Sequence, residues 1–479
     1  MQAFTRPPGG AADEDGSGLM RRKTRRGAWL AGVGTAVLLS GCAVGTGGGS
    51  GADADYDSDA KLGGTLSVMG FGAGDEVATA RVDYTTAQLG DVEVDLIEGE
   101  LDLQQFLSAV ATGDPPELVY ADRDQIGSLA ARGAIRPLDD CVDGEGIDLD
   151  AYVPAAVDQV TLDGTVYGIP EFNQVQLTMA NSDLLQAAGL GIDDVDGSDR
   201  DAVTAANEKL MRSDGGTVSV IGFDSKLPEF LPLWVAAGGG SVLSDDGRTA
   251  QLDSQEAVDA LSWAARIYDD QGGFSAVKAT RDAADFFGEG NQFASGTLGA
   301  MPMEQWYLNV LNDVSPDAPM AFDTVRTTDG EPIAFATGSA WAIPTGSENP
   351  EAACRWAKDM TSVEAWRAAA EARLSAREVD GKPFTGILTG NTVADEEIRG
   401  MVTSGGEPWD SGVTAMYEAN DHTVGLPSNP ADAEFKDAMQ DAVNRVLEGR
   451  ESPEDALAKA QQTAQQALDE GWQKLEESE

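Results

Sequence analysis

The chain has 479 residues, of which 42% are hydrophobic and 24% charged, so it is long enough for two or three domains with packed cores. Acidic residues outnumber basic residues by 82 to 32, which gives a formal net charge of −50. A surface with this charge repels phosphate backbones and excludes a nucleic-acid partner. His422 is the only histidine in the sequence. Metal sites built from histidine ligands are therefore excluded, and a Ser-His-Asp triad could use only this residue. We expect neither a metal nor a cofactor.

The N-terminal segment is typical of an exported protein. Basic residues at 21–26 precede a short apolar run from Ala28 to Leu39, which ends in Leu39-Ser40-Gly41-Cys42. A basic head, a short apolar run and a small-residue cleavage site define a secretory signal. Residues 1–41 are therefore interpreted as a signal peptide, with Met20 as an alternative start.

The sequence around Cys42 resembles the bacterial lipobox, in which the cysteine is diacylated and becomes the first residue of the mature chain. Each buried methylene contributes about 0.8 kcal/mol, so two acyl chains hold a folded domain on the outer face of the cell membrane. The alternative is an ordinary signal peptide with an incidental cysteine. Residues 42–61 are rich in Gly, Ser and Asp and are expected to form a flexible tether.

Strand and helix patterns alternate after this tether. The predicted strands cover 65–69, 92–97 and 118–121, and the predicted helices cover 103–111 and 125–131. This order favours a parallel sheet with right-handed crossovers, in which ligands bind beyond the carboxyl ends of the strands, near Asp122. In the tail, apolar residues at helical spacing over 435–446 and 457–475 predict an antiparallel helix pair.

Two cysteines remain after Cys42. An exported chain permits a disulfide between Cys141 and Cys354. The alternative is two isolated small hydrophobic side chains, because their distance cannot be read from the sequence.

Six stretches in order resemble one family, the extracellular solute-binding proteins of ABC importers, in the group of maltose-binding protein. The resemblance extends from about Gly63 to Glu470, and its specificity comes from the order of the stretches rather than from any one of them. The stretches are Thr112–Tyr120, Leu129–Asp139, Asp163–Pro170, Ala180–Leu190, Gly338–Ala353 and the turn from Gly449 to Leu457.

The resemblance implies an α/β, two-lobe periplasmic-binding-protein-like fold of type II. Each lobe is expected to be a mainly parallel sheet flanked by helices, and a multi-strand hinge is expected to join the lobes and let them close on a ligand. The expected first lobe is 62–175 plus 332–388, and the expected second lobe is 176–331 plus 389–479.

The implied function is that of a membrane-anchored receptor, not an enzyme. It would capture a small solute, a sugar or an oligosaccharide, and deliver it to the transmembrane permease subunits of an ABC importer. We expect a monomer that meets the membrane only through its lipid anchor.

Sugars present C–H faces that stack on aromatic rings and hydroxyls that bind carboxylates and amides. Met303–Tyr307 combines such groups after a predicted strand, and the family has a sugar-stacking tryptophan there, which implies this role for Trp306. The alternative is a helix start buried against the sheet. The complete set of candidate ligand-binding residues is Trp306, Glu304, Tyr307, Glu171, Asn173, Trp234, Gly239, Asp122, Ser339 and Trp409.

Two other classes of protein stay open. A glycoside-processing enzyme would need an acid and a base such as Glu171 and Glu304. Among 82 acidic residues such a pair is uninformative. A non-transport surface lipoprotein would explain the anchor but not the two-lobe pattern.

Overall fold

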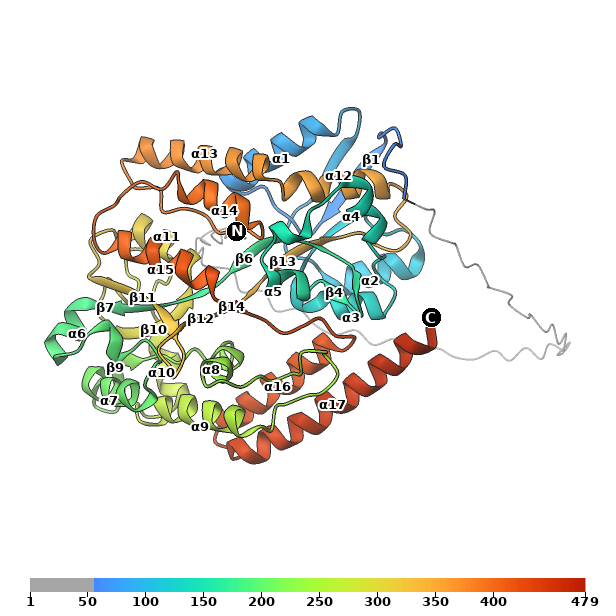
Figure 1. The fold of residues 1–479 in the computed structure, drawn as a ribbon. Coiled ribbons are helices and arrows are strands. Elements are labelled where there is room, and N and C mark those ends of the chain that lie inside the picture. The colour runs from blue at the N-terminus through green and yellow to red at the C-terminus, as the bar shows by residue number, and fades with distance from the viewer. Residues whose placement is uncertain (1–55, 479) are drawn as a thin grey trace, which may run out of the picture. The chain divides into compact units, whose positions relative to one another are not determined.

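A computed structural model describes residues 56–478, which hold two mixed β-sheets, a two-stranded hairpin and the helices around them (Figure 1). The predicted signal peptide, Cys42 and most of the predicted tether lie outside the described residues. Within 56–478, no helix combines the length and the apolar character needed to cross a membrane.

The first sheet has the strand order β2-β1-β3-β13-β6. Its strands are β1 (Thr65–Met69), β2 (Glu93–Ile97), β3 (Leu118–Asp122), β6 (Ile169–Gln174) and β13 (Thr337–Ala342). The predicted strands at 65–69, 92–97 and 118–121 are confirmed, and their pairings are parallel as expected. Strand β13 runs antiparallel to both β3 and β6.

Eight helices and the small hairpin accompany the first sheet. They are α1 (Glu76–Gln88), α2 (Leu103–Thr112), α3 (Ile126–Ala131), α4 (Asp139–Glu145), α5 (Pro154–Asp158), α12 (Pro350–Met360), α13 (Val363–Asp380), α14 (Thr392–Arg399), and the hairpin strands β4 (Thr161–Leu162) and β5 (Thr165–Val166). Helices α2 and α3 were predicted, whereas α1 was missed. Its buried face includes Arg81 and Thr85, so its sequence lacks an apolar stripe.

The second sheet has the order β14-β12-β11-β7-β10-β9-β8. Its strands are β7 (Gln176–Asn181), β8 (Arg212–Asp214), β9 (Thr217–Phe223), β10 (Leu298–Glu304), β11 (Met320–Arg326), β12 (Pro332–Phe335) and β14 (Thr423–Val424). The accompanying helices are α6 (Ser182–Ala188), α7 (Arg200–Leu210), α8 (Leu231–Ala237), α9 (Gln255–Asp269), α10 (Phe274–Asp282), α11 (Trp306–Val314) and α15 (Trp409–Asp421).

Both sheets are mixed, which corrects the expectation of mainly parallel sheets. The chain changes sheet twice through extended backbone, from β6 to β7 at Val175 and from β12 to β13 at Ala336. The strands that make these crossings pair antiparallel with neighbours such as β10 and β11. Strand β12 pairs with β11, so it lies in the second sheet although the boundary expected at residue 332 placed it with the first.

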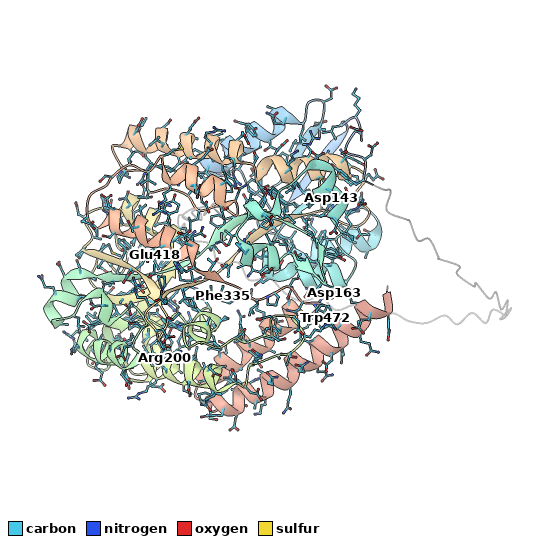
Figure 2. All side chains as sticks on the ribbon, viewed as in Figure 1. Asp143, Asp163, Arg200, Phe335, Glu418 and Trp472 are labelled. Atoms are coloured by element: carbon cyan, nitrogen blue, oxygen red, sulfur yellow. A yellow bond between two sulfur atoms is a disulfide. The ribbon has the colours of Figure 1, made fainter. Side chains whose placement is uncertain are left out.

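The tail forms the predicted helix pair, α16 (Asp432–Leu447) and α17 (Pro453–Ser478), which pack against each other. Ser452 caps α17 by accepting a hydrogen bond from the backbone N–H of Asp455 (3.2 Å). At the other end of α17, the Arg248 guanidinium lies over the Trp472 ring (4.0 Å) and 3.7 Å from the Asp163 carboxylate. Figure 2 shows Trp472 and Asp163 close together. The tail therefore contacts elements of both sheets.

Helices α4 and α12 are joined covalently, because Cys141 and Cys354 form a disulfide with a Cα–Cα distance of 5.9 Å. The Tyr56 hydroxyl donates a hydrogen bond to Glu145 Oε1 (2.7 Å), and its ring lies so close to Gly144 that an added Cβ would come within 2.8 Å of it. The chain therefore packs on α4 from Tyr56 onward, although the predicted tether extended to residue 61.

Candidate functional site

A buried arginine organises the place where the strands cross between the sheets. Arg123, at the end of β3, donates to the carbonyl oxygens of Phe172 and Thr337 (both 2.6 Å) and to Asn173 Oδ1 (2.8 Å). Gly338 makes room for this contact, since a Cβ there would lie 2.8 Å from Arg123 Nη1 and 2.0 Å from the Phe172 oxygen. Burial lowers the pKa of Arg123 to about 10, so the side chain is still charged at neutral pH.

Glu171 is fully buried and forms an ion pair with Arg81. Its second oxygen accepts a hydrogen bond from the Tyr120 hydroxyl. Arg81 also lies over the Trp366 ring, 3.8 Å from its centroid. Both carboxylate oxygens are thus used inside the protein, and the structure places this candidate in a structural ion pair rather than on an accessible wall.

One accessible polar wall forms around Asp122, the last residue of β3. Its Oδ1 accepts a hydrogen bond from Ser339 Oγ (3.4 Å), and Asp124 forms an ion pair with Lys436 of α16. Asp122 is exposed to solvent, yet neighbouring protein raises its pKa, first through burial and then through Asp124. Burial alone would lower the pKa of Lys436, but Asp124 raises it overall.

The second wall is aromatic and begins at the end of β10. Trp306, the first residue of α11, is half-buried, and its ring is nearly parallel to that of Phe287 (interplanar angle 19°, centroids 6.2 Å apart). Phe287 is 43% exposed. Glu304 lies two residues before Trp306 in the chain, and burial raises its pKa. This arrangement combines flat apolar rings with a carboxyl.

Tyr307 supports this wall from behind. It is 1% exposed, its ring stacks on Phe286 (4.2 Å), and its hydroxyl donates to the Phe286 carbonyl (2.8 Å). The predicted contact of Tyr307 with a ligand is therefore replaced by a role in holding the loop that carries Phe287.

Gln305 connects the aromatic wall to the crossing strands. Its backbone N–H donates to the Val175 carbonyl (2.9 Å), and its Oε1 accepts from the Val175 N–H (2.9 Å). Its Nε2 donates to the Asn173 carbonyl (3.1 Å). Because Arg123 binds the Asn173 side chain and is the neighbour of Asp122, the polar and aromatic walls are both linked to Asn173. Asn173 itself is fully buried and does not face solvent.

Three predicted residues lie elsewhere. Trp234 is 2% exposed, packs edge-on against Trp263 (4.8 Å) and donates its ring N–H to the Ser225 carbonyl (2.8 Å). Trp409 is also buried, against Phe322. Gly239 is exposed just after α8, with a φ of +82° that favours glycine. Trp234 and Trp409 therefore contribute to the core, and no contact links Gly239 to either wall among the described residues.

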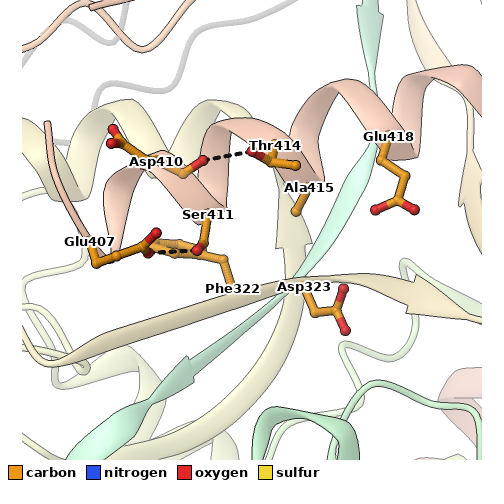
Figure 3. A pocket seen from close by; sticks show the side chains of 8 residues that line it. All are labelled: Phe322, Asp323, Glu407, Asp410, Ser411, Thr414, Ala415 and Glu418. Carbon is orange, nitrogen blue, oxygen red and sulfur yellow. Dashed lines mark hydrogen bonds between the residues drawn. The ribbon is translucent and has the colours of Figure 1, made fainter. Parts of the chain in front are cut away.

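A separate pocket of about 310 Å³ lies between β11 and α15 (Figure 3). None of the predicted residues lines it. Asp323 in this pocket is paired with Arg326 (2.9 Å), and Asp410 accepts from the Gly405 N–H (2.8 Å). Its lining residues are Phe322, Asp323, Glu407, Asp410, Ser411, Thr414, Ala415 and Glu418. In the part of the chain that the structure describes, no cluster of three potential metal ligands is present here or elsewhere.

Comparison with known proteins finds one family, described as bacterial extracellular solute-binding protein, whose model matches residues 87–365. The maltodextrin-binding protein MdxE of Bacillus subtilis is 23% identical over 273 residues, which are 56% of this chain and 62% of that protein. The chain thus spans less than two thirds of this relative.

Solved structures agree with the fold described above. CpMnBP1 with mannobiose bound has a TM-score of 0.66 at 22% identity, covering 84% of this chain and 99% of its own. Lmo0181 of Listeria monocytogenes, an ABC substrate-binding protein in complex with cycloalternan, has a TM-score of 0.67 at 19% identity, with coverages of 85% and 99%. The α/β two-lobe fold expected from the sequence is thereby confirmed.

Proposed function

Because the chain belongs to the bacterial extracellular solute-binding proteins, we propose that it captures a small solute between two lobes and delivers it to the permease of an ABC importer. The observation that carries this proposal is the family match, which spans strands of both sheets and both crossings. We assign the elements around the first sheet to lobe 1 and those around the second sheet to lobe 2, with boundaries at Val175, at Ala336 and between α14 and α15. Helix α14 packs on α13 and is therefore assigned to lobe 1, although the expected second lobe began at residue 389. Closure would bring the polar and aromatic walls onto the solute.

The proposed solute is a carbohydrate. Trp306 and Phe287 offer apolar faces for C–H groups, while Asp122, Asp124 and Lys436 offer acceptors and donors for hydroxyls. The excess of carboxyl groups over cations on these walls disfavours a strongly anionic ligand. The relatives and structural neighbours are named for maltodextrin, mannobiose and cycloalternan, which supports an oligosaccharide.

The enzyme alternative has less support. Its acid and base pair included Glu171, whose two oxygens are taken up by Arg81 and Tyr120. A glycosidase would need both carboxyls at the scissile bond.

Anchoring is proposed on the sequence of residues 39–42. The expected consequence is that Cys42→Ala releases the mature protein from membranes or leaves it unprocessed, as measured by detergent phase partitioning. Unchanged partitioning of the variant would remove the lipid anchor from the proposal.

Calorimetric titration with glucose, maltose, maltotriose, mannobiose and mannotriose tests the receptor. We expect at least one saccharide to bind and to be recovered intact by mass spectrometry after prolonged incubation. A ligand at 100 times its Kd would also stabilise the protein by about 2.7 kcal/mol in thermal melting. Binding followed by cleavage would favour the glycosidase, and no binding across the series would argue against a carbohydrate solute of these types.

A further inference from the structure

A buried chain of polar side chains joins the lobes beside the crossing strands. It starts at Arg123, which donates to Asn173 Oδ1 (2.8 Å). Asn173 Nδ2 then donates to Asn420 Oδ1 (2.8 Å), and Asn420 Nδ2 donates to Asp395 Oδ2 (3.1 Å). All four side chains are less than 9% exposed, so water does not readily replace these bonds, and the two asparagine amides depend on their neighbours in the chain.

Asn420 is the member of this chain that comes from lobe 2. It lies at the end of α15, which packs against β11, β12 and β7 of the second sheet. Its two partners belong to lobe 1, since Asn173 is on β6 and Asp395 is on α14, which packs against α13. The amide of Asn420 is thus inserted between two side chains of the opposite lobe.

The side chain needed at this position has to accept on one side and donate on the other. Asn173 Nδ2 requires an acceptor, because Arg123 occupies its Oδ1. The Asp395 carboxyl, whose pKa burial raises to about 8, accepts at Oδ2 from Asn420 and at Oδ1 from the Thr389 N–H (2.7 Å). An amide satisfies both with its own oxygen and N–H, whereas an apolar group removes both bonds from their buried partners.

We propose that Asn420 is a positioning residue of the hinge, and that its bonds to Asn173 and Asp395 fix the axis about which the lobes close. Asn420 precedes β14 by three residues, and Asn173 precedes the crossing at Val175 by two. The bond between them therefore lies close to the segments that join the lobes, where rotation of the lobes is expected to move atoms least. Asn420 thus bonds α15 to the side chain of Asn173. Gln305 bonds to the backbone carbonyl of the same Asn173. The inference rests on the lobe closure of the proposed function but not on the identity of the solute.

The test compares Asn420→Ala with Asn207→Ala. Asn207 is a fully buried asparagine whose bonds, to the Phe223 N–H (2.9 Å) and the Ile267 carbonyl (3.3 Å), stay within lobe 2. In the ligand-free full chain, we expect Asn420→Ala to speed amide hydrogen exchange at Val175 and Gln305 about tenfold and to broaden the small-angle scattering distance distribution. Asn207→Ala should lower the Tm but speed exchange only around Phe223.

The proposal would be overturned if the Val175 amide exchanged at the same rate in both variants. It would also be overturned if Asn420→Ala exchanged there no faster than the wild type. If Asn420→Ala does not fold, Asn420→Leu fills a similar volume but offers neither an acceptor to Asn173 nor a donor to Asp395, and the same increase in exchange is expected. Maltotriose binding is measured in parallel, with an affinity loss of about threefold to tenfold expected through faster release. If the wild type binds no saccharide, the carbohydrate proposal fails, while the exchange data still decide the role of Asn420.

Discussion

Trp306 is the side chain on which the proposed binding of a sugar depends most. Trp306→Ala removes an aromatic face at the accessible wall, so we expect a loss of about 2–4 kcal/mol in binding free energy, measured by calorimetry. The fold should persist, because this side chain is half-buried. Trp356→Ala is the contrasting variant, since Trp356 is fully buried and its truncation should lower the free energy of unfolding by about 3–5 kcal/mol. Normal saccharide binding with an early melt in Trp306→Ala would assign Trp306 to the core.

At the level of a single residue, Asp359 on α12 is expected to make the free energy of unfolding depend on pH. Burial raises its pKa from 3.8 to about 6, although Arg355 and Lys358 oppose the change. Folding therefore favours the protonated carboxyl, and this stabilisation is full below pH 4 and is lost as the pH rises through about 6.

Between pH 4 and pH 7, we expect the wild type to lose about 1 kcal/mol of its free energy of unfolding that the Asp359→Asn variant retains. This value allows for solvent screening of a partly accessible group. Urea denaturation of both proteins at pH 4, 5, 6 and 7 measures the difference. Parallel stability profiles for the two proteins would contradict the assignment.

At the scale of elements, the disulfide between α4 and α12 closes a loop with a sequence separation of 213 residues. Reducing it, or replacing Cys141 and Cys354 by alanine, should lower the free energy of unfolding by about 2–5 kcal/mol, because the unfolded chain gains conformational freedom. Denaturant titrations with and without a thiol reductant measure this loss. The double alanine variant is the control, because its denaturation midpoint should not change when the reductant is added. A wild-type midpoint that is also unchanged by the reductant would refute the expectation.

Elements with local signals could be predicted from the sequence. Strands β1 and β3, helix α2 and the α16–α17 pair follow from apolar periodicity and from caps such as Ser452. Helix α1 could not, because Arg81 on its buried face is compensated by Glu171, which follows 90 residues later.

The candidate site was only partly predictable for the same reason. Trp306 comes just after β10 and Asp122 is the last residue of β3, so both could be placed at strand ends. Lys436 meets Asp124 across a separation of 312 residues, and Phe287 becomes a wall residue only because Tyr307 holds its loop. Trp234 is among the residues that the sequence offers as ligand-binding candidates, but its ring packs against Trp263 and Phe223. Long-range contacts, not local patterns, decide these positions.

On the scale of the whole molecule, the net charge of −50 makes stability depend on salt. Like charges repel across the folded surface more strongly than in the expanded chain, and the screening length falls from about 30 Å at 0.01 M to about 10 Å at 0.1 M salt. We therefore expect the Tm to rise by several degrees between 10 mM and 300 mM NaCl in calorimetry. Sodium sulfate at matched ionic strength should produce at least the same rise, and a Tm that falls with salt would show that attractive ion pairs dominate instead.

The contact of Tyr56 with α4 also determines how the fold resists a mechanical load. A pull on the chain ahead of Tyr56 meets its bond to Glu145 first, and Glu145 is held in turn by Arg355 and Lys358 of α12. The disulfide joins the same two helices, so the force is shared between two helices and a covalent bond. Strand β1, which lies between β2 and β3, is loaded only after the Tyr56 contact has ruptured. Tension from the N-terminal side is thus borne at the periphery of the first sheet before it can unzip a central strand.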